Sequence, residues 1–243
     1  MMDLNKLKFI PFYLISWLPF SALYLWSDLL FVFTFYLVRY RRTVVNHNLK
    51  LSFPNKSDSE IRSIEKKFYQ HFCDVIFESL KGLTISKKAI KKRYFVDGHE
   101  QVNELYADNR NVILYAAHIG NWEWLTFMPL VLDHKCITLF QPLTNNYFNE
   151  LLKLIRSNLG VVCLESNKGL KTHFELRAEE TPVITCMIGD QSPSRKAISP
   201  TWIPFLHRNT AFHNGTEKIA RKFNYAVSVS YTPLRAHETV VRI

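Results

Sequence analysis

Short uncharged runs alternate with helix-like segments from residue 111 onward, and this alternation constrains the fold more than any other feature. The expected strands are Asn111–Ala117, Cys136–Phe140, Val161–Leu164, Pro182–Ile188 and Ala226–Tyr231. The expected helices are Trp122–Leu132, Tyr147–Leu159, Lys168–Glu180 and Thr216–Phe223. Such alternation predicts a mostly parallel sheet with helices on both faces, so we expect a three-layer α/β domain from residue 45 to residue 243.

The first 44 residues are typical of a membrane anchor. No charged residue occurs from Phe9 to Ser27, and the run after Asp28 is again uncharged and rich in aromatic residues. About 20 apolar residues span a hydrocarbon core of about 30 Å, so Phe9 to Ser27 is long enough to cross. Pro11 and Pro19 leave a kinked re-entrant or interfacial hairpin open as an alternative.

Basic residues flank this anchor unequally. Arg39, Arg41 and Arg42 follow it, whereas Lys6 and Lys8 precede it. The positive-inside rule therefore places the remainder of the chain in the cytoplasm.

The helix-forming pattern after the anchor begins at Ser57-Asp-Ser-Glu60, the signature of a capping box, and reaches about Lys81. Its apolar residues recur every three or four positions, which predicts an amphipathic helix. The lysine-rich run from Lys87 to Arg93 is interpreted as a solvated face, and a docking surface for an acidic carrier or anionic headgroups is the alternative.

The net charge of +10 indicates an anionic partner. Nucleic acid, anionic lipid and an acidic carrier protein all fit the charge, but the Phe and Trp residues crowded into the first forty positions favour a membrane over nucleic acid. The four cysteines form no CxxC pair and have no histidine at ligand spacing. We therefore expect reduced, buried cysteines and no metal site.

The segment His118-Ile-Gly-Asn-Trp-Glu123 stands where a predicted buried strand ends and a helix begins, and ligands bind at such ends in open α/β sheets. On one continuous helix His118 and Glu123 would lie about 140° apart. Gly120 can turn the chain and Asn121 suits an N-cap, which would let Glu123 orient His118 as a general base. The alternative is a structural histidine, with Glu123 complementing the helix dipole.

No GxSxG elbow and no reactive-cysteine context occur in the sequence. A covalent acyl-enzyme therefore lacks an obvious nucleophile. The base is then expected to activate a substrate hydroxyl for direct attack on an acyl thioester.

Several ordered blocks resemble the lipid A biosynthesis acyltransferases of the HtrB type, within the lysophospholipid acyltransferase superfamily. The His118 to Glu123 segment is similar to their H-x4-D/E motif. The other blocks are Asn48–Pro54, Gln141–Asn146, Arg156–Gly160, Asp190–Gln191 and Trp202–Phe205, followed by Ala211 and Gly215.

This resemblance implies an inner-membrane enzyme that takes acyl groups from acyl carrier protein, or from CoA, and acylates a lipid-linked hydroxyl on the cytoplasmic face. His118 would be the base and Glu123 its partner. The candidate substrate-binding residues are Asn121, Arg156, Asp190 and Gln191, with no metal and no cofactor beyond the acyl thioester. The guanidinium of Arg156 is suited to binding a phosphate, and the alternative is that Arg156 is simply an exposed surface residue. Without the resemblance, Asp190 would be interpreted as a turn residue that bonds to its own backbone.

Departures from the family pattern leave other possibilities open. Phe212-His-Asn-Gly215 replaces a turn that often contains threonine, and the chain ends at Ile243 where the family usually continues, so we expect a C-terminal truncation. A lysophospholipid or aminolipid acceptor is the rival within the same chemistry. A basic membrane-bound binding protein that uses Lys87 to Arg93 is the rival without catalysis.

Overall fold

The computed structural model describes residues 4–166, 171, 175, 181–193, 200–231 and 240–242. Contacts within the chain divide it into two compact units. The helical unit comprises Met1–Lys81 and Ser192–Phe212, and the sheet unit comprises Gly82–Gln191 and His213–Ile243. The helix expected over residues 168–180 falls outside the described residues, except at Lys171 and Glu175.

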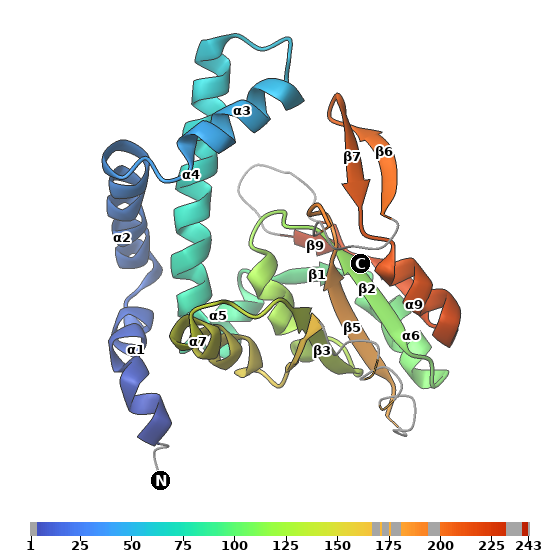
Figure 1. Ribbon diagram of the computed structural model, residues 1–243. Helices are drawn as coiled ribbons and strands as arrows, with labels where there is room; N and C mark the ends of the chain where they lie inside the picture. Colours follow the sequence, from blue (N-terminus) through green and yellow to red (C-terminus); the bar gives the residue numbers. More distant parts are fainter. Residues whose placement is uncertain are drawn as a thin grey trace. The chain divides into compact units, whose positions relative to one another are not determined.

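A five-stranded parallel sheet forms the centre of the sheet unit, in the order β4-β3-β5-β2-β8 (Figure 1). Its strands are β2 (Val112–Ala116), β3 (Lys135–Phe140), β4 (Val162–Glu165), β5 (Val183–Ile188) and β8 (Ala226–Val229). Each predicted strand is present with its bounds shifted by at most two residues. The prediction of a mostly parallel sheet is therefore confirmed.

Helices pack on both faces of this sheet. On one face, Ile113 of β2 packs against Ala220 and Phe223 of α9 (Gly215–Phe223). On the other face lies η3 (Trp122–Leu130), whose residues from Trp124 to Met128 are all buried. The predicted α-helix is a 3-10 helix here. Burial of five consecutive residues and the internal Pro129 do not suit an α-helix with one apolar stripe.

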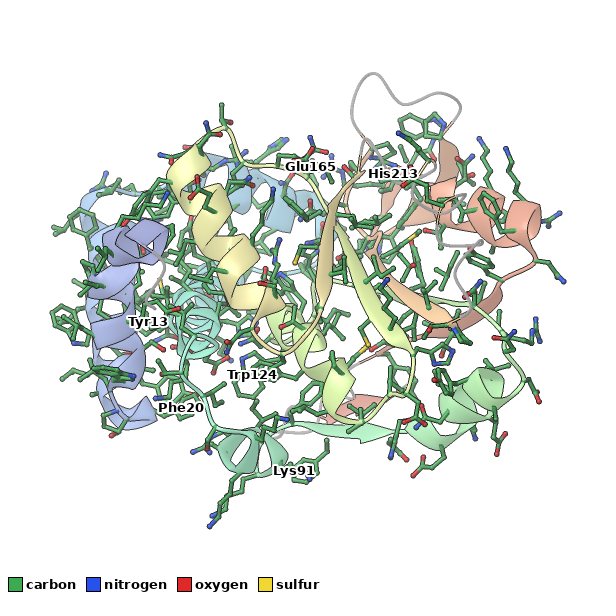
Figure 2. All side chains as sticks on the ribbon, turned by 90° about the horizontal axis from the view of Figure 1, so that it is seen from below. Tyr13, Phe20, Lys91, Trp124, Glu165 and His213 are labelled. Carbon is green, nitrogen blue, oxygen red and sulfur yellow. The ribbon has the colours of Figure 1, made fainter. Side chains whose placement is uncertain are left out.

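The described residues of the sheet unit contain five further elements. They are α5 (Lys87–Lys91), β1 (Phe95–Asp97), α6 (His99–Ala107), α7 (Asn146–Ser157) and β9 (Val240–Arg242), with β1 parallel to β9. Only Ile90 of α5 is buried, and the lysines of α5 are exposed, as Figure 2 shows for Lys91. The exposed lysines fit both a solvated face and a docking surface.

The helical unit begins with η1 (Leu4–Phe9), α1 (Ile10–Trp17), α2 (Phe20–Val32) and the π-helix η2 (Phe33–Leu37). These are followed by α3 (Arg42–Ser52) and α4 (Asp58–Lys81). The blue helices α1 and α2 run beside α4 (Figure 1). The capping box at the start of α4 is confirmed, because Glu60 N–H donates to Ser57 Oγ and Ser57 N–H donates to the Glu60 carboxylate.

A β-hairpin completes the helical unit. It consists of β6 (Thr201–Phe205) and β7 (Arg208–Phe212), joined through Leu206 and His207, both with positive φ. His207 Nδ1 lies 3.1 Å from the carbonyl oxygen of Ser52, so the hairpin is linked to the end of α3.

Candidate active site

His118 and Asp190 lie at the carboxyl ends of two neighbouring parallel strands. His118 follows β2 and Asp190 follows β5, and Ala116 pairs with Ile188 where these strands end. The imidazole Nδ1 of His118 is 2.6 Å from Asp190 Oδ1, and the backbone N–H of His118 donates to Asp190 Oδ2 at 3.0 Å. The carboxylate thus fixes both the ring and the backbone of the histidine. Both side chains remain partly exposed, at 26% and 36%.

This bond leaves Nε2 as the imidazole nitrogen that faces a substrate. With Asp190 bound at Nδ1, the proton of the neutral imidazole belongs on Nδ1, and Nε2 is free to accept one. The side-chain nitrogen Nε2 of Gln191 lies 3.4 Å from His118 Nε2. The indole of Trp122 meets the imidazole edge to face, with 5.1 Å between ring centroids. The imidazole is therefore held on three sides.

Close packing positions the chain just before Asp190. The phenol of Tyr115 donates a hydrogen bond to the carbonyl oxygen of Gly189 at 3.0 Å. A Cβ atom built on Gly189 would lie 2.5 Å from the Tyr115 ring, so a larger residue would require the ring or the loop to shift. On the histidine side, Gly120 has a φ of 60°, which confirms the turn predicted for that position.

Glu123 is bonded to Arg156, whereas the sequence analysis expected it to orient His118. Arg156 Nε donates to Glu123 Oε2 at 2.8 Å and Nη2 donates to Oε1 at 2.5 Å, a bidentate pair. Glu123 lies in the first turn of η3 and Arg156 in the last turn of α7, so the pair joins two elements on one face of the sheet. The carboxylate that orients His118 in this structure is Asp190.

The Glu123–Arg156 pair is largely buried, with side-chain exposures of 12% and 18%. Burial acts to lower the pKa of Arg156, but the bonds and the charge of Glu123 outweigh it, so the pKa is raised overall. The fork of donors that would suit a phosphate is engaged by this carboxylate.

A cavity of about 240 Å³ opens beside His118 in the sheet unit. Its wall includes Trp122, Glu123, Arg156 and Gln191, together with apolar side chains. These apolar residues come from η3, β3, α7 and β5, among them Leu125, Met128, Leu139, Leu152, Ile184 and Ile188. The apolar part of this lining suits a hydrocarbon chain whose reacting end stays at the imidazole.

Cysteines also line the cavity, but they are poor nucleophiles. Burial raises the pKa of Cys136 and of Cys186, each to about 12, so both thiols stay protonated at neutral pH. All four cysteines are free; three are buried and Cys163 is half-buried. Within the described residues, no group of three His, Cys, Asp or Glu side chains could hold a metal ion.

Asn121 stands at the N-cap position of η3, as the sequence analysis expected. Its side chain, however, makes no capping hydrogen bond, and it is buried at 6% exposure. One signal in the sequence could have indicated that Asp190 is the partner of His118. Both residues follow runs that are predicted as buried strands.

Comparison with known proteins identifies the family of the chain. No curated protein matches the sequence. The family model of bacterial lipid A biosynthesis acyltransferases matches residues 6–242, which is nearly the whole chain. The match covers the histidine at the end of β2, its carboxylate partner after β5 and the neighbouring cavity. The chain therefore belongs to the bacterial lipid A biosynthesis acyltransferase family and is an acyltransferase.

Proposed function

We propose that the chain transfers a fatty acyl group from a thioester of acyl carrier protein, or of CoA, to a hydroxyl of a lipid A-type glycolipid precursor. His118 acts as the general base and Asp190 orients it. The observation that carries this proposal is the 2.6 Å contact at Nδ1, which directs Nε2 toward the acceptor hydroxyl.

The reaction requires only one proton carrier. The acceptor oxygen bonds to the thioester carbonyl carbon while its proton passes to His118 Nε2. When the tetrahedral intermediate collapses, the carbon–sulfur bond breaks and the proton on Nε2 passes to the leaving thiolate. The products are an ester and a free thiol, and the base returns to its neutral form.

The cavity supports the choice of a fatty acyl donor. Its apolar side chains suit an alkyl chain, and His118 and Gln191 are part of the same lining. Glu123 and Arg156 form part of the wall and tie η3 to α7. We assign them a positioning role, holding the wall in place while the thioester reacts.

Membrane association completes the proposal. One apolar helix, Phe20–Leu37, is long enough by length and composition to cross a membrane. Residues 1–44 would hold the catalytic domain, residues 45–243, on the cytoplasmic face of the inner membrane, where an acyl carrier protein is available.

The test is transfer of radiolabelled acyl groups to a panel of acceptors by membranes that contain the full chain. His118→Ala is expected to lower kcat/KM about 10²–10⁴-fold, the usual contribution of a general base. Transfer to a lysophospholipid or an aminolipid, but not to a lipid A precursor, would replace the proposed acceptor and keep the mechanism. A fully active His118→Ala enzyme would overturn the mechanism.

Two further variants identify the partner of His118. Asp190→Asn is expected to lower kcat strongly, because the imidazole loses the carboxylate that fixes its tautomer and its orientation. Glu123→Gln is expected to lower kcat less, since Glu123 is bonded to Arg156 and not to His118. The opposite pattern would restore Glu123 as the orienting carboxylate.

A further inference from the structure

The N-terminal helices expose an unusually apolar surface. Seven side chains, each between 52% and 70% exposed, form what we call the outer face: Leu14, Trp17, Leu25, Trp26, Leu29, Phe33 and Leu37. Figure 2 shows aromatic side chains projecting outward from these helices. Soluble monomers rarely leave so many large apolar side chains together in water, so this surface requires an apolar partner.

The opposite side of the same helices is bound to α4 along its length. Ser27 donates to Asp74 at 2.6 Å, Tyr24 donates to Glu78 at 2.8 Å, and the ring of Phe35 packs on Tyr69. Nine residues of α4 are Asp, Glu, Lys or Arg, so α4 cannot itself enter hydrocarbon. The apolar helices are therefore attached lengthwise to a helix that must stay in water.

Each candidate span also has a charge at its midpoint. The uncharged run from Phe9 to Ser27 is broken between α1 and α2, where Lys81 Nζ donates to the carbonyl oxygens of Ser16 and Leu18 at 2.8 Å each. In the helical run from Phe20 to Leu37 the midpoint is Asp28, which is exposed. A charge at the centre of a bilayer is costly, and neither span avoids one.

We infer that this anchor lies in the membrane surface and does not cross it. The outer face enters the boundary between headgroups and acyl chains, and α4 lies on the water side. On the wheel of α2, Leu25 and Leu29 point away from the buried Leu23 and Ser27, as an interfacial helix requires.

Charge complementarity identifies the lipid surface as anionic. Exposed Arg39 and Arg41 follow the outer face directly, where they can bind anionic headgroups. Asp28 lies at the margin of the outer face and can remain hydrated. This inference rests on the membrane association proposed above, and it adds that the chain before and after the anchor remains on one side of the bilayer.

Depth measurements on the full chain test this arrangement. Single fluorescent probes attached to cysteines introduced at Leu14, Leu25, Leu29 and Leu37 are read in vesicles of phosphatidylethanolamine and phosphatidylglycerol, with quenchers at known depths. The expected result is one shallow depth for all four probes. Deep probes at Leu25 and Leu29, with a shallow probe at Leu37 near the end of the helix, would establish a span and overturn the inference.

A partition experiment separates the inference from membrane association itself. Leu29→Asp is expected to weaken binding of the full chain to these vesicles about tenfold, because a charge replaces an embedded leucine. The matched control Gln70→Asp, at an exposed position of α4, should change binding less than about twofold. Equal loss in both variants would overturn the inference, and a wild-type chain that does not bind vesicles would overturn membrane association as well.

Discussion

The sheet unit and the helical unit differ in where their largest apolar side chains lie. In the sheet unit, Val112, Ile113 and Leu114 of β2 are completely buried. In the helical unit, the most buried positions include Ser16, Ser27 and Glu65, at 0% to 1% exposure. The large apolar side chains of α1 and α2 lie outside, which is the reverse of an ordinary soluble core.

This difference shows that the two units are built for different surroundings. Water drives the apolar strands of the sheet inward, and helices cover them on both faces. The helical unit holds α2 on α4 through both hydrogen bonds and a small apolar cluster of Phe31, Phe35, Tyr69 and Cys73. Its other large apolar side chains are exposed, which is the surface we infer to contact lipid. Apolar runs of sequence therefore form buried strands in the sheet unit, whereas in α1 and α2 they leave many apolar side chains exposed.

Truncation of a leucine in each unit tests this contrast with the largest expected effect. Leu114→Ala should lower the free energy of unfolding by about 2–5 kcal/mol, since it opens a cavity in a closed core. Leu25→Ala, at a position that is 62% exposed, should change it by less than about 0.5 kcal/mol. Urea unfolding in dilute detergent gives both values. Equal losses would mean that the outer face is packed against protein.

The buried ion pairs sharpen the comparison, because each unit has one. Arg156→Met leaves the buried carboxylate of Glu123 without a cation, and Arg42→Met leaves that of Glu65 without one. Each substitution should therefore lower the free energy of unfolding by about 2–4 kcal/mol. Adding Glu123→Gln to Arg156→Met should recover part of the loss. The exposed pair of Arg221 with Glu217 provides the control, since Arg221→Met should cost less than about 1 kcal/mol.

The junction between α1 and α2 tests the polar interior of the helical unit on a smaller scale. Lys81→Met removes the ammonium group that donates to the carbonyl oxygens of Ser16 and Leu18. It should lower the free energy of unfolding by about 1–3 kcal/mol. Hydrogen exchange should speed up in α1 and around Pro19 while β2 stays protected. Lys67→Met, at an exposed position of α4, is the control. Faster exchange in β2 would contradict a local effect.

The smallest expected effect is a pH dependence in the sheet unit. Burial lowers the pKa of His134 below 6.5, although its bond to the carbonyl oxygen of Arg110 and the charge of Asp133 oppose this. Below pH 6.5 the unfolded chain therefore binds the extra proton, and folding stability falls as the pH falls, by at most about 1.4 kcal/mol per pH unit. Unfolding at pH 7.5 and pH 5.5 measures it. In His134→Gln the free energy of unfolding should differ less between the two pH values than it does in the wild-type chain. If the difference is the same in both proteins, the pH dependence comes from another group.

The sheet could be predicted because its strands are uncharged runs bounded by polar residues. The sequence pattern located β2, β3 and β5 to within two residues. It failed at η3, since Trp122 to Leu130 is apolar throughout and carries no periodicity that separates a 3-10 helix from an α-helix. The break between α1 and α2 was foreseen only as a possible kink at Pro19, because the capping lysine lies more than sixty residues further along the chain.

The site could be predicted in its residues but not in its pairings. The sequence identified His118, Glu123, Arg156 and Asp190, yet it joined His118 to the nearest carboxylate along the chain. The observed bond to Asp190 depends on β5 lying beside β2, and strand order does not follow from the spacing of motifs. Glu123 was likewise assigned to the wrong partner because Arg156 reaches it from α7.

The contact between Tyr115 and Gly189 has a consequence for how this site can change over successive generations. A side chain larger than hydrogen at position 189 would collide with the phenol ring, so the ring or the loop that carries Asp190 must shift. A smaller residue at position 115 removes this collision, so a change at position 189 is tolerated better after a change at position 115. The order of substitutions, and not only their identity, therefore limits which variants of this site are reachable.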